Sequence, residues 1–446
     1  MTECSSRFAD QRLRTAIIGT GLAGLTTAYL LNNDEKQRYE LTLLEQADSL
    51  SFDSASVAVK NHQTGTIERA DLPMRTSAGG YYAILNRMYR HLGMPTHPVR
   101  FLFVFAKALR SSMSDSNTTT QQPHFKEYFV LYLIICHFCF AVACFFVQPH
   151  IETESVADYL DRIWLPRRYA RTDAGFSGGD LVAYIKNSYR QQHYTVCGGV
   201  RQVQARLANG IGKKNMRVKC RVLSVTPEEQ TGRVVVRWQV VGADSTAVCE
   251  DAFDRVVLAV SPDIVGRILQ VPRLSAALAK IPTVRVESSV LAPSGPSARY
   301  SIVEDEEDAA VCMHHTNSEA APAQVITLRS QFSTSQGSPS GRSEALHAMP
   351  GGVVSTCPLD RASGEVKCVL KTAGFTRTLR SVKGRGVVGA IMGHGRSDIG
   401  WVNGQDNVWL AGSWCWDGMV LLEGCVVSAM RIAGDFGVRI PREAKE

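Results

Sequence analysis

The sequence predicts an α/β protein that begins with a Rossmann-like nucleotide-binding unit. Three features carry this prediction: an apolar run typical of a strand at residues 14–18, a glycine-rich turn behind it, and a helical pattern over residues 22–31. The turn has the form Gly19-x-Gly21-x-x-Gly24. In such a unit the first glycine allows the tight turn, the second lets a pyrophosphate approach the backbone, and the third lets helix and strand pack closely. The helix start then offers free N–H groups to phosphate.

A second strand is expected at residues 40–44, and it ends at Glu45. This acid lies about 20 residues beyond Gly24, where a carboxylate accepts hydrogen bonds from a ribose hydroxyl. The alternative is a glycine-rich turn with a surface glutamate, but the spacing rules of the motif all hold. The choice between FAD and NAD(P) stays open on these residues alone. The candidates for binding the dinucleotide are Gly19, Gly21, Leu22, Ala23, Gly24 and Glu45.

Composition limits the class of protein. The chain has 446 residues, of which 45% are hydrophobic and 20% charged, and this suits a globular protein of two intertwined domains. The net charge of +7 is mild and no nucleic-acid motif is present, so we expect no nucleic-acid partner. The 12 cysteines lack zinc-site spacing, so we expect no metal. The polar N-terminus carries no secretory signal, which favours an intracellular location.

Further elements follow from periodicity. Residues 83–92 form an amphipathic helix with Leu85, Met88 and Leu92 on one face, and Gly198-Gly199 opens another helix. The chain is expected to end with a strand at residues 407–412, a loop, and a helix at residues 421–433. Residues 333–348 are rich in turn formers and are expected to be an exposed loop. Strands are predicted at residues 217–226, 232–241 and 253–260, with a second sheet built from residues 325–328, 352–356 and 365–370.

Residues 129–147 are almost uninterruptedly apolar. At about 1.5 Å per residue a helix of this length could cross a ~30 Å hydrocarbon core, so hydropathy predicts a transmembrane segment. However, if both ends of the chain hold one cofactor, a single span would put them on opposite sides of the membrane. We therefore expect a buried helix, a monotopic insertion or a re-entrant hairpin, and favour a helix at the mouth of the substrate cavity that can dip into a membrane surface. The location is then cytoplasmic or membrane-associated.

The chain resembles the FAD-dependent amine oxidase and carotenoid desaturase superfamily, and most of all fungal amine-oxidase-like FAD/NAD(P)-binding proteins. The first residues that carry the resemblance are the opening glycines with Glu45. The others are the segment Val196-x-Gly198-Gly199-Val200, the strand Phe253–Ala259, and an end segment with Gly412-Ser413 and Glu423-Gly424-Cys425. The resemblance implies a Rossmann-like FAD-binding domain of the GR2 type, interleaved with a substrate domain made of a mixed sheet and helices.

The resemblance also implies domain boundaries and site residues. Glu45 would bind the adenosine ribose, Val222 would contact the adenine, and Gly412, Ser413 and Leu422 would hold the ribityl and flavin end. Candidates for the flavin-facing cavity are Arg75, Tyr81, Trp414 and Trp416, while no catalytic residue is assigned. The FAD-binding domain is expected at residues 1–75, 196–270 and 401–446, and the substrate domain at residues 76–195 and 271–400.

The implied activity is hydride transfer to flavin N5 from a C–N or C–C bond of a small or lipophilic substrate. Departures from the family pattern leave two alternatives open. Residues 48–53 lack the Gly-Gly-Arg of the family, and Ser413 stands where an acid is expected. A degenerate, non-catalytic flavin-fold protein associated with a membrane is the first alternative. An NAD(P)-dependent dehydrogenase, which would share only the opening motif, is the second.

Overall fold

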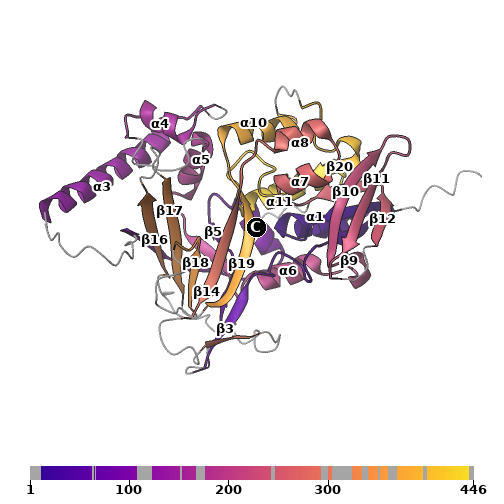
Figure 1. Cartoon of the computed structure of the whole chain (residues 1–446), viewed down its shortest axis with the longest axis horizontal. Helices are drawn as coiled ribbons and strands as arrows, with labels where there is room; N and C mark the ends of the chain where they lie inside the picture. The colour runs from indigo at the N-terminus through magenta and orange to yellow at the C-terminus, as the bar shows by residue number, and fades with distance from the viewer. Residues whose placement is uncertain are drawn as a thin grey trace, which may run out of the picture.

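The computed structural model has a nucleotide-binding half, a central sheet and a helical unit, which lie side by side (Figure 1). The structure describes residues 12–440 except for residues 63–64, 66, 108–122, 151–152, 167–175, 243–246, 293–299, 304–323, 334–339, 350–351, 360–368 and 395–398.

A five-stranded parallel sheet forms the nucleotide-binding half, with the order β20-β13-β1-β2-β9. Strands from both ends of the chain therefore lie in one sheet, with β20 two places from β1. The bounds of its strands are β1 Leu13–Ile18, β2 Tyr39–Leu44, β9 Met216–Arg217, β13 Arg255–Leu258 and β20 Val408–Leu410.

Alternation along β1 explains how this sheet is covered. Ile17 faces one core, which contains helices α1 (Leu22–Asn32), α2 (Ala83–His91), α6 (Val200–Ala208) and α11 (Leu422–Asp435). Its neighbours Ala16 and Ile18 face the opposite core. Because side chains alternate with a period of two, a strand whose residues are all apolar needs cover on both faces.

The second face is covered by a three-stranded antiparallel sheet and three helices (Figure 1). Val234, Val236 and Trp238 of the middle strand point into this core, as the alternation of the sequence predicts. The elements are β10 Cys220–Glu228, β11 Arg233–Val240, β12 Val248–Phe253, α7 Pro262–Ile268, α8 Pro272–Leu278 and α10 Val382–Ile391.

A six-stranded sheet with the order β19-β14-β18-β17-β16-β7 forms the centre of the second half. Its pairs are antiparallel except for β16 with β7, which is parallel and stands at the edge. The strands are β7 Phe101–Lys107, β14 Thr283–Leu291, β16 Gln324–Ser333, β17 Ser340–Met349, β18 Gly352–Thr356 and β19 Val369–Thr378.

Small three-stranded sheets complete the strand content of the described residues. The first has the order β15-β3-β4 and packs its valines against β14 and β18. The second has the order β5-β8-β6. Their strands are β3 Val57–Asn61, β4 Ile67–Ala70, β5 Thr76–Ala78, β6 Thr96–Val99, β8 His193–Val196 and β15 Tyr300–Val303.

The helical unit consists of α3 (Pro123–Phe146), α4 (Val156–Arg162) and α5 (Gly178–Ser188), which share one small core. Ser155 begins α4 with a capping box, in which its side chain and that of Asp158 each accept from the other's backbone N–H. The apolar run is thus a helix that packs on α4 and α5. A search of the described residues finds no helix long and apolar enough to cross a membrane, so the transmembrane prediction from hydropathy is not supported.

The structure corrects three predictions about elements. The strand predicted at residues 217–226 is divided between two sheets, because Lys219 has a φ of 56° and turns the chain between β9 and β10. The strand predicted at residues 253–260 is likewise divided, between β12 and β13. The exposed loop predicted at residues 333–348 is wrong at Ser333, which ends β16, and at residues 340–348, where β17 pairs with both β16 and β18; residues 334–339 lie outside the described part of the chain.

Candidate cofactor site

The glycine-rich turn between β1 and α1 leaves open space before the helix. Gly19 has a φ of 95°, and a Cβ there would lie 2.7 Å from the carbonyl oxygen of Ala259. A Cβ on Gly24 would collide with the carbonyl of Gly19, so helix and strand pack as the motif predicts. A Cβ on Gly21, in contrast, would meet no atom within 4 Å. Gly21 is the N-cap, with neither a side-chain cap nor an acid in the first turn, so the N-terminus of α1 faces free space.

Glu45 is fixed beside this turn. One of its carboxylate oxygens, Oε2, accepts hydrogen bonds from Thr20 N (2.9 Å) and Thr20 Oγ1 (2.6 Å), and Oε1 accepts from Ala47 N (3.0 Å). The backbone carbonyl of Glu45 accepts from Cys220 N, at the start of the strand that contains Val222. Glu45 is therefore hydrogen-bonded to the start of the strand that carries Val222. Thr20 is a site residue that the sequence did not single out; its place inside the glycine motif and its hydroxyl are the available signals.

The other end of the chain forms a second helix start that has no side-chain cap. Strand β20 leads into Gly412, whose N–H donates to Ser428 Oγ (3.0 Å) of α11. Helix α11 begins at Leu422, and its N-cap Leu421 offers no side-chain cap. Ser413 lies in the intervening loop, and its carbonyl oxygen would be 2.6 Å from a Cβ on Gly424. The loop therefore lies directly on the first turn of α11.

The two helix starts meet at Cys425. Burial raises the pKa of its thiol to about 11, while the nearby Arg75 charge and the backbone groups of Ala23 and Ser413 oppose that rise. Ala23 belongs to the first turn of α1, and Cys425 belongs to the first turn of α11. Residues from the two ends of the chain thus form one site, next to a cation.

Arg75 lies at this junction, in a cluster of charged residues. Its guanidinium stands 4.9 Å from the centre of the Phe52 ring, and its Nη2 donates weakly to the Phe52 carbonyl at 3.4 Å. Burial lowers the pKa of Arg75, which Asp71 counteracts. Asp71 accepts from Val200 N at the start of α6, and Arg69 is paired with Asp53. Arg75 Nε is buried and has no hydrogen-bond partner within the described residues.

The aromatic candidates differ in their surroundings. Trp414 is only 2% exposed and donates to the carbonyl of Val260, so it belongs to the core. Trp416 and Tyr81 form an edge-to-face pair with ring centres 6.0 Å apart, and Tyr81 Oη accepts from Met419 N (2.9 Å). Buried Arg380 donates to the carbonyls of Trp416 and Gly418. The loop that carries Trp416 is therefore held from both sides.

Glu423 has a structural role that the sequence analysis did not assign. Its carboxylate oxygens accept from Ile84 N and Leu85 N, each at 2.9 Å, and so cap helix α2. Burial raises the pKa of Glu423. Because this carboxylate is committed to α2, it leaves the first turn of its own helix α11 without an acidic cap.

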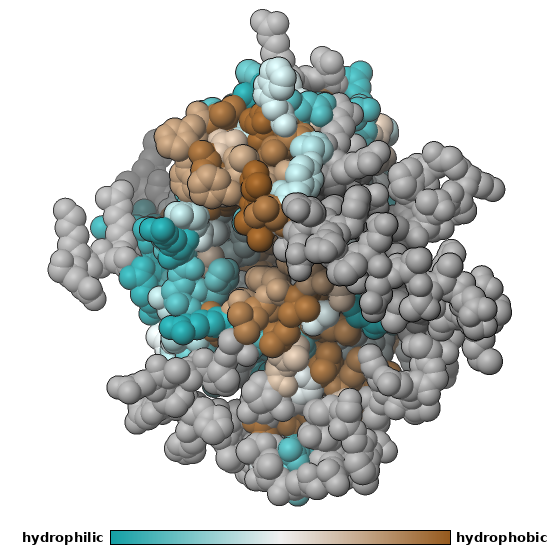
Figure 2. Space-filling model, turned by 90° about the vertical axis from the view of Figure 1, so that its left-hand side faces the viewer, coloured by the Kyte–Doolittle hydropathy of each residue, from teal (hydrophilic) through white to brown (hydrophobic). Residues whose placement is uncertain are grey.

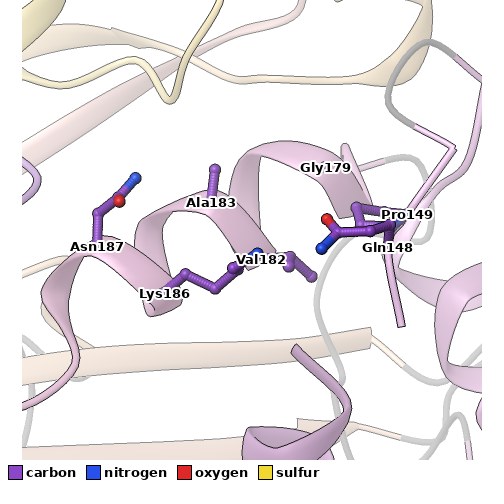
Figure 3. Close-up of a pocket in the computed structure, with 7 residues that line it drawn as sticks. All are labelled: Gln148, Pro149, Gly179, Val182, Ala183, Lys186 and Asn187. Atoms are coloured by element: carbon purple, nitrogen blue, oxygen red, sulfur yellow. The ribbon is translucent and has the colours of Figure 1, made fainter. Parts of the chain in front are cut away.

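A hollow in the helical unit is separate from these candidates. It is lined by one face of α5 and by the segment after α3, where Lys186, Asn187 and Gln148 provide the polar groups (Figure 3). None of the predicted cofactor residues lines it.

The residues at the junction fit FAD. Open space at Gly21, two helix starts without side-chain caps, and the orphaned Arg75 Nε match a large ligand with an anionic diphosphate and flavin carbonyls. Groups of three or more metal-ligating side chains are not found in the part of the chain that the structure describes. Fold and site together define an α/β protein of the dinucleotide-binding class.

Comparison with known families makes this class more specific. Residues 17–92 match the NAD(P)-binding Rossmann-like domain, and residues 158–299 match the flavin containing amine oxidoreductase family. A comparison with curated proteins gave no significant match. The two matches confirm the resemblance to the FAD-dependent amine oxidase superfamily over these parts of the chain.

Solved structures share the fold at low identity. A CLA-producing fatty acid isomerase from P. acnes has a TM-score of 0.56 at 12% identity, over 95% of this chain and 98% of its own. Cyclohexylamine oxidase from Brevibacterium oxydans has a TM-score of 0.53 at 12% identity, over 96% and 100%. A redesigned putrescine oxidase has a TM-score of 0.51 at 14% identity, also over 96% and 100%. These similarities confirm the predicted fold class.

Proposed function

We propose that the chain is an FAD-dependent oxidoreductase of the amine-oxidase type, which takes a hydride from a C–N or C–C bond of a small or lipophilic substrate. The observation that supports the proposal is that two helix starts without side-chain caps, from opposite ends of the chain, pack together beside Arg75. A flavin dinucleotide is long enough to need both ends, with its pyrophosphate at one helix and its ring system at the other.

Each end of the site has a distinct task in this proposal. The backbone N–H groups at the start of α1 would hold the pyrophosphate, with Gly21 leaving room for it. Glu45, fixed by Thr20, would accept from the adenosine ribose, and Val222 would contact the adenine. Gly412, Ser413 and Leu422 would hold the ribityl and flavin end. When bound, the isoalloxazine ring supplies the redox chemistry.

The aromatic residues would shape the substrate side and exclude water. Tyr81 packs edge-to-face with Tyr82, Tyr184 and Trp416. Burial raises the pKa of Tyr81 well above its usual value, so its hydroxyl stays neutral at physiological pH. In this proposal Tyr81 would line the cavity and would not act as a base, and its hydroxyl accepts a hydrogen bond from Met419 N. An apolar wall of this kind suits an amine or a lipophilic substrate.

The position of Arg75 weakens one argument for a degenerate, non-catalytic flavin-fold protein. The segment at residues 48–53 lacks the arginine of the family pattern, but Arg75 stacks on Phe52 of that same segment. We infer that Arg75 brings the missing positive charge to the cofactor. The dehydrogenase alternative needs only the start of α1 and gives no role to the matching start of α11.

Replacing Arg75 tests the site. Arg75→Met should weaken FAD binding roughly ten-fold or more, because a charge-assisted hydrogen bond contributes about 1.5–3 kcal/mol. Binding is measured by the quenching of flavin fluorescence as the apoprotein is titrated into FAD. Arg377→Met is the matched control, since Arg377 also stacks on an aromatic ring, that of Phe375, but lies on β19. If the two variants bind FAD with equal affinity, Arg75 is not part of the cofactor site.

Turnover is tested on the flavin-loaded protein without oxygen. Loss of the oxidised flavin absorbance on adding a primary amine or an unsaturated lipid supports an oxidoreductase and identifies the substrate class. A protein that binds FAD tightly but is reduced by no member of an amine and lipid panel supports the degenerate alternative. Tight binding of NAD⁺ or NADP⁺ in place of FAD supports the dehydrogenase alternative.

A further inference from the structure

The outer side of helix α3 is a continuous apolar stripe. Its members stand at positions i, i+3, i+4, i+7, i+11 and i+15 of the helix, so they lie on one helix face, and their exposed fractions range from 40% to 82%. The opposite side, with Cys136, Phe140 and Cys144, is buried against α4 and α5. A helix that is apolar on all sides is normally buried. In the described part of α3, however, the outward-facing apolar side chains are exposed. The stripe consists of Leu131, Ile134, Ile135, Phe138, Val142 and Phe146.

A second exposed apolar area lies on the same side of the molecule. Strand β7 is the edge of the six-stranded sheet next to β16, and the exposed fractions of Leu102, Phe103, Val104 and Phe105 are 46% to 78%. In Figure 1 both α3 and β16 stand at the left, and Figure 2 shows hydrophobic surface in two areas of that face. Exposed apolar surface gathered on one face marks an interaction site.

Aromatic and basic side chains lie near the C-terminal end of α3, in α5 and in the segments that follow α4 and α5. The Tyr189 ring packs edge-to-face on Phe145 at 5.2 Å, and the Arg190 guanidinium lies 5.3 Å from the centre of the Tyr189 ring. Lys186 lines the adjoining hollow (Figure 3). Trp164, just beyond α4, is 92% exposed. We call Trp164, Lys186, Tyr189 and Arg190 the rim.

Two buried acidic side chains of this unit are paired with arginines outside the rim. Glu154 is bound by Arg162, and Asp180 is bound by Arg380 and Arg385. An apolar helix face with tryptophan, tyrosine, lysine and arginine nearby is the composition of a segment that lies in the headgroup region of a bilayer.

We propose that this face docks on a lipid bilayer with anionic headgroups, with α3 lying in the interface and the rim at the phosphates. Helix α3 does not cross the bilayer, because β1 before it and β20 after it lie in the same sheet. A second copy of the chain fits less well, since two basic rims would gather at one self-complementary interface. Anionic lipid pairs those charges instead.

Vesicle flotation of the full chain tests the proposal. Wild type should float with vesicles of phosphatidylcholine and phosphatidylserine, and less with phosphatidylcholine alone. Ile134→Glu/Phe138→Glu should abolish flotation, because each charge would enter the apolar layer. Val240→Glu/Val248→Glu is the matched control: these two valines are also exposed, at 41% and 54%, but they lie in β11 and β12. Lys186→Ala and Arg190→Ala should each weaken binding to the anionic vesicles about five-fold.

A measurement on the wild-type protein does not depend on whether the variants fold. Brominated lipid should quench the fluorescence of Trp164 in the wild type, and the quenching should fall in Trp164→Phe. Failure of the wild type to float with either vesicle overturns the proposal. A wild type that stays off vesicles but forms a dimer that Ile134→Glu disperses also overturns it, in favour of a second copy. Equal flotation of the α3 variant and its control excludes α3 as the docking element.

Discussion

At the residue scale, two glycines of one motif have opposite structural constraints. A Cβ at Gly21 meets open space, and the φ of this residue is −65°, which any residue adopts. A Cβ at Gly24 collides with the backbone of Gly19. The fold therefore requires a glycine at position 24, whereas we propose that the glycine at position 21 leaves room for the ligand.

Gly21→Ser and Gly24→Ala should separate binding from stability. Serine is a good N-cap, so Gly21→Ser should keep the free energy of unfolding but fill the space before α1, and FAD binding should weaken roughly ten-fold or more, about 1.4 kcal/mol. Gly24→Ala should lose about 2 kcal/mol of stability through overpacking. Urea unfolding and FAD titration of both variants check this, and a Gly21→Ser protein that binds FAD like wild type would refute the assignment of that space.

At the scale of elements, helix α2 depends on a cap from the far end of the chain. Glu423→Ala would leave the Ile84 and Leu85 amides without acceptors and should cost about 2 kcal/mol in the free energy of unfolding. Glu423→Gln keeps one acceptor oxygen and removes the buried charge, whose desolvation raises the pKa of Glu423. It should therefore lower the free energy of unfolding by less than Glu423→Ala does. Urea unfolding of the two variants measures the difference, and an alanine variant as stable as the glutamine variant would contradict the capping role.

The segment before α4 should give a pH-dependent contribution to stability. Arg162 donates to both carboxylate oxygens of Glu154 and holds the pKa of Glu154 below its usual value of 4.5. Because the pKa of Glu154 is lower in the folded than in the unfolded protein, the ion pair stabilises the fold fully above the unfolded-state pKa. This stabilisation is lost as the pH falls through the folded-state pKa. Glu154→Gln should therefore cost about 1 kcal/mol at neutral pH and little below about pH 3. Thermal unfolding across this range checks it, with the exposed Glu40→Gln as control; a pH-independent difference would count against the ion pair.

Elements with a strong local signal could be predicted from the sequence, and those fixed by distant partners could not. The glycine turn, the α2 helix and the alternation of β11 follow from spacing alone. Strand β17 was missed because serine, glycine and charged residues form it only where β16 and β18 pair on both sides. At the site, Glu45 was predictable from its distance to Gly24, whereas the capping role of Glu423 depends on a helix more than 300 residues earlier in the sequence.

At the scale of the whole molecule, the proposed binding site draws on both ends of the chain. Because β1 and β20 flank β13 in one sheet, a ligand that bridges α1 and α11 also ties these ends together. Saturating FAD should therefore stabilise the protein, by about 2.7 kcal/mol at a hundred-fold excess over Kd. Calorimetric melting with FAD should show this gain and melting with NAD⁺ should not; an equal gain with NAD⁺ would favour the dehydrogenase alternative.

The most direct test of the central claim is the absorption spectrum of the purified protein, recorded before and after acid release. We expect the bands of oxidised flavin, with the chromophore released by acid as FAD. A protein that is colourless, and stays colourless after incubation with FAD, would contradict the account.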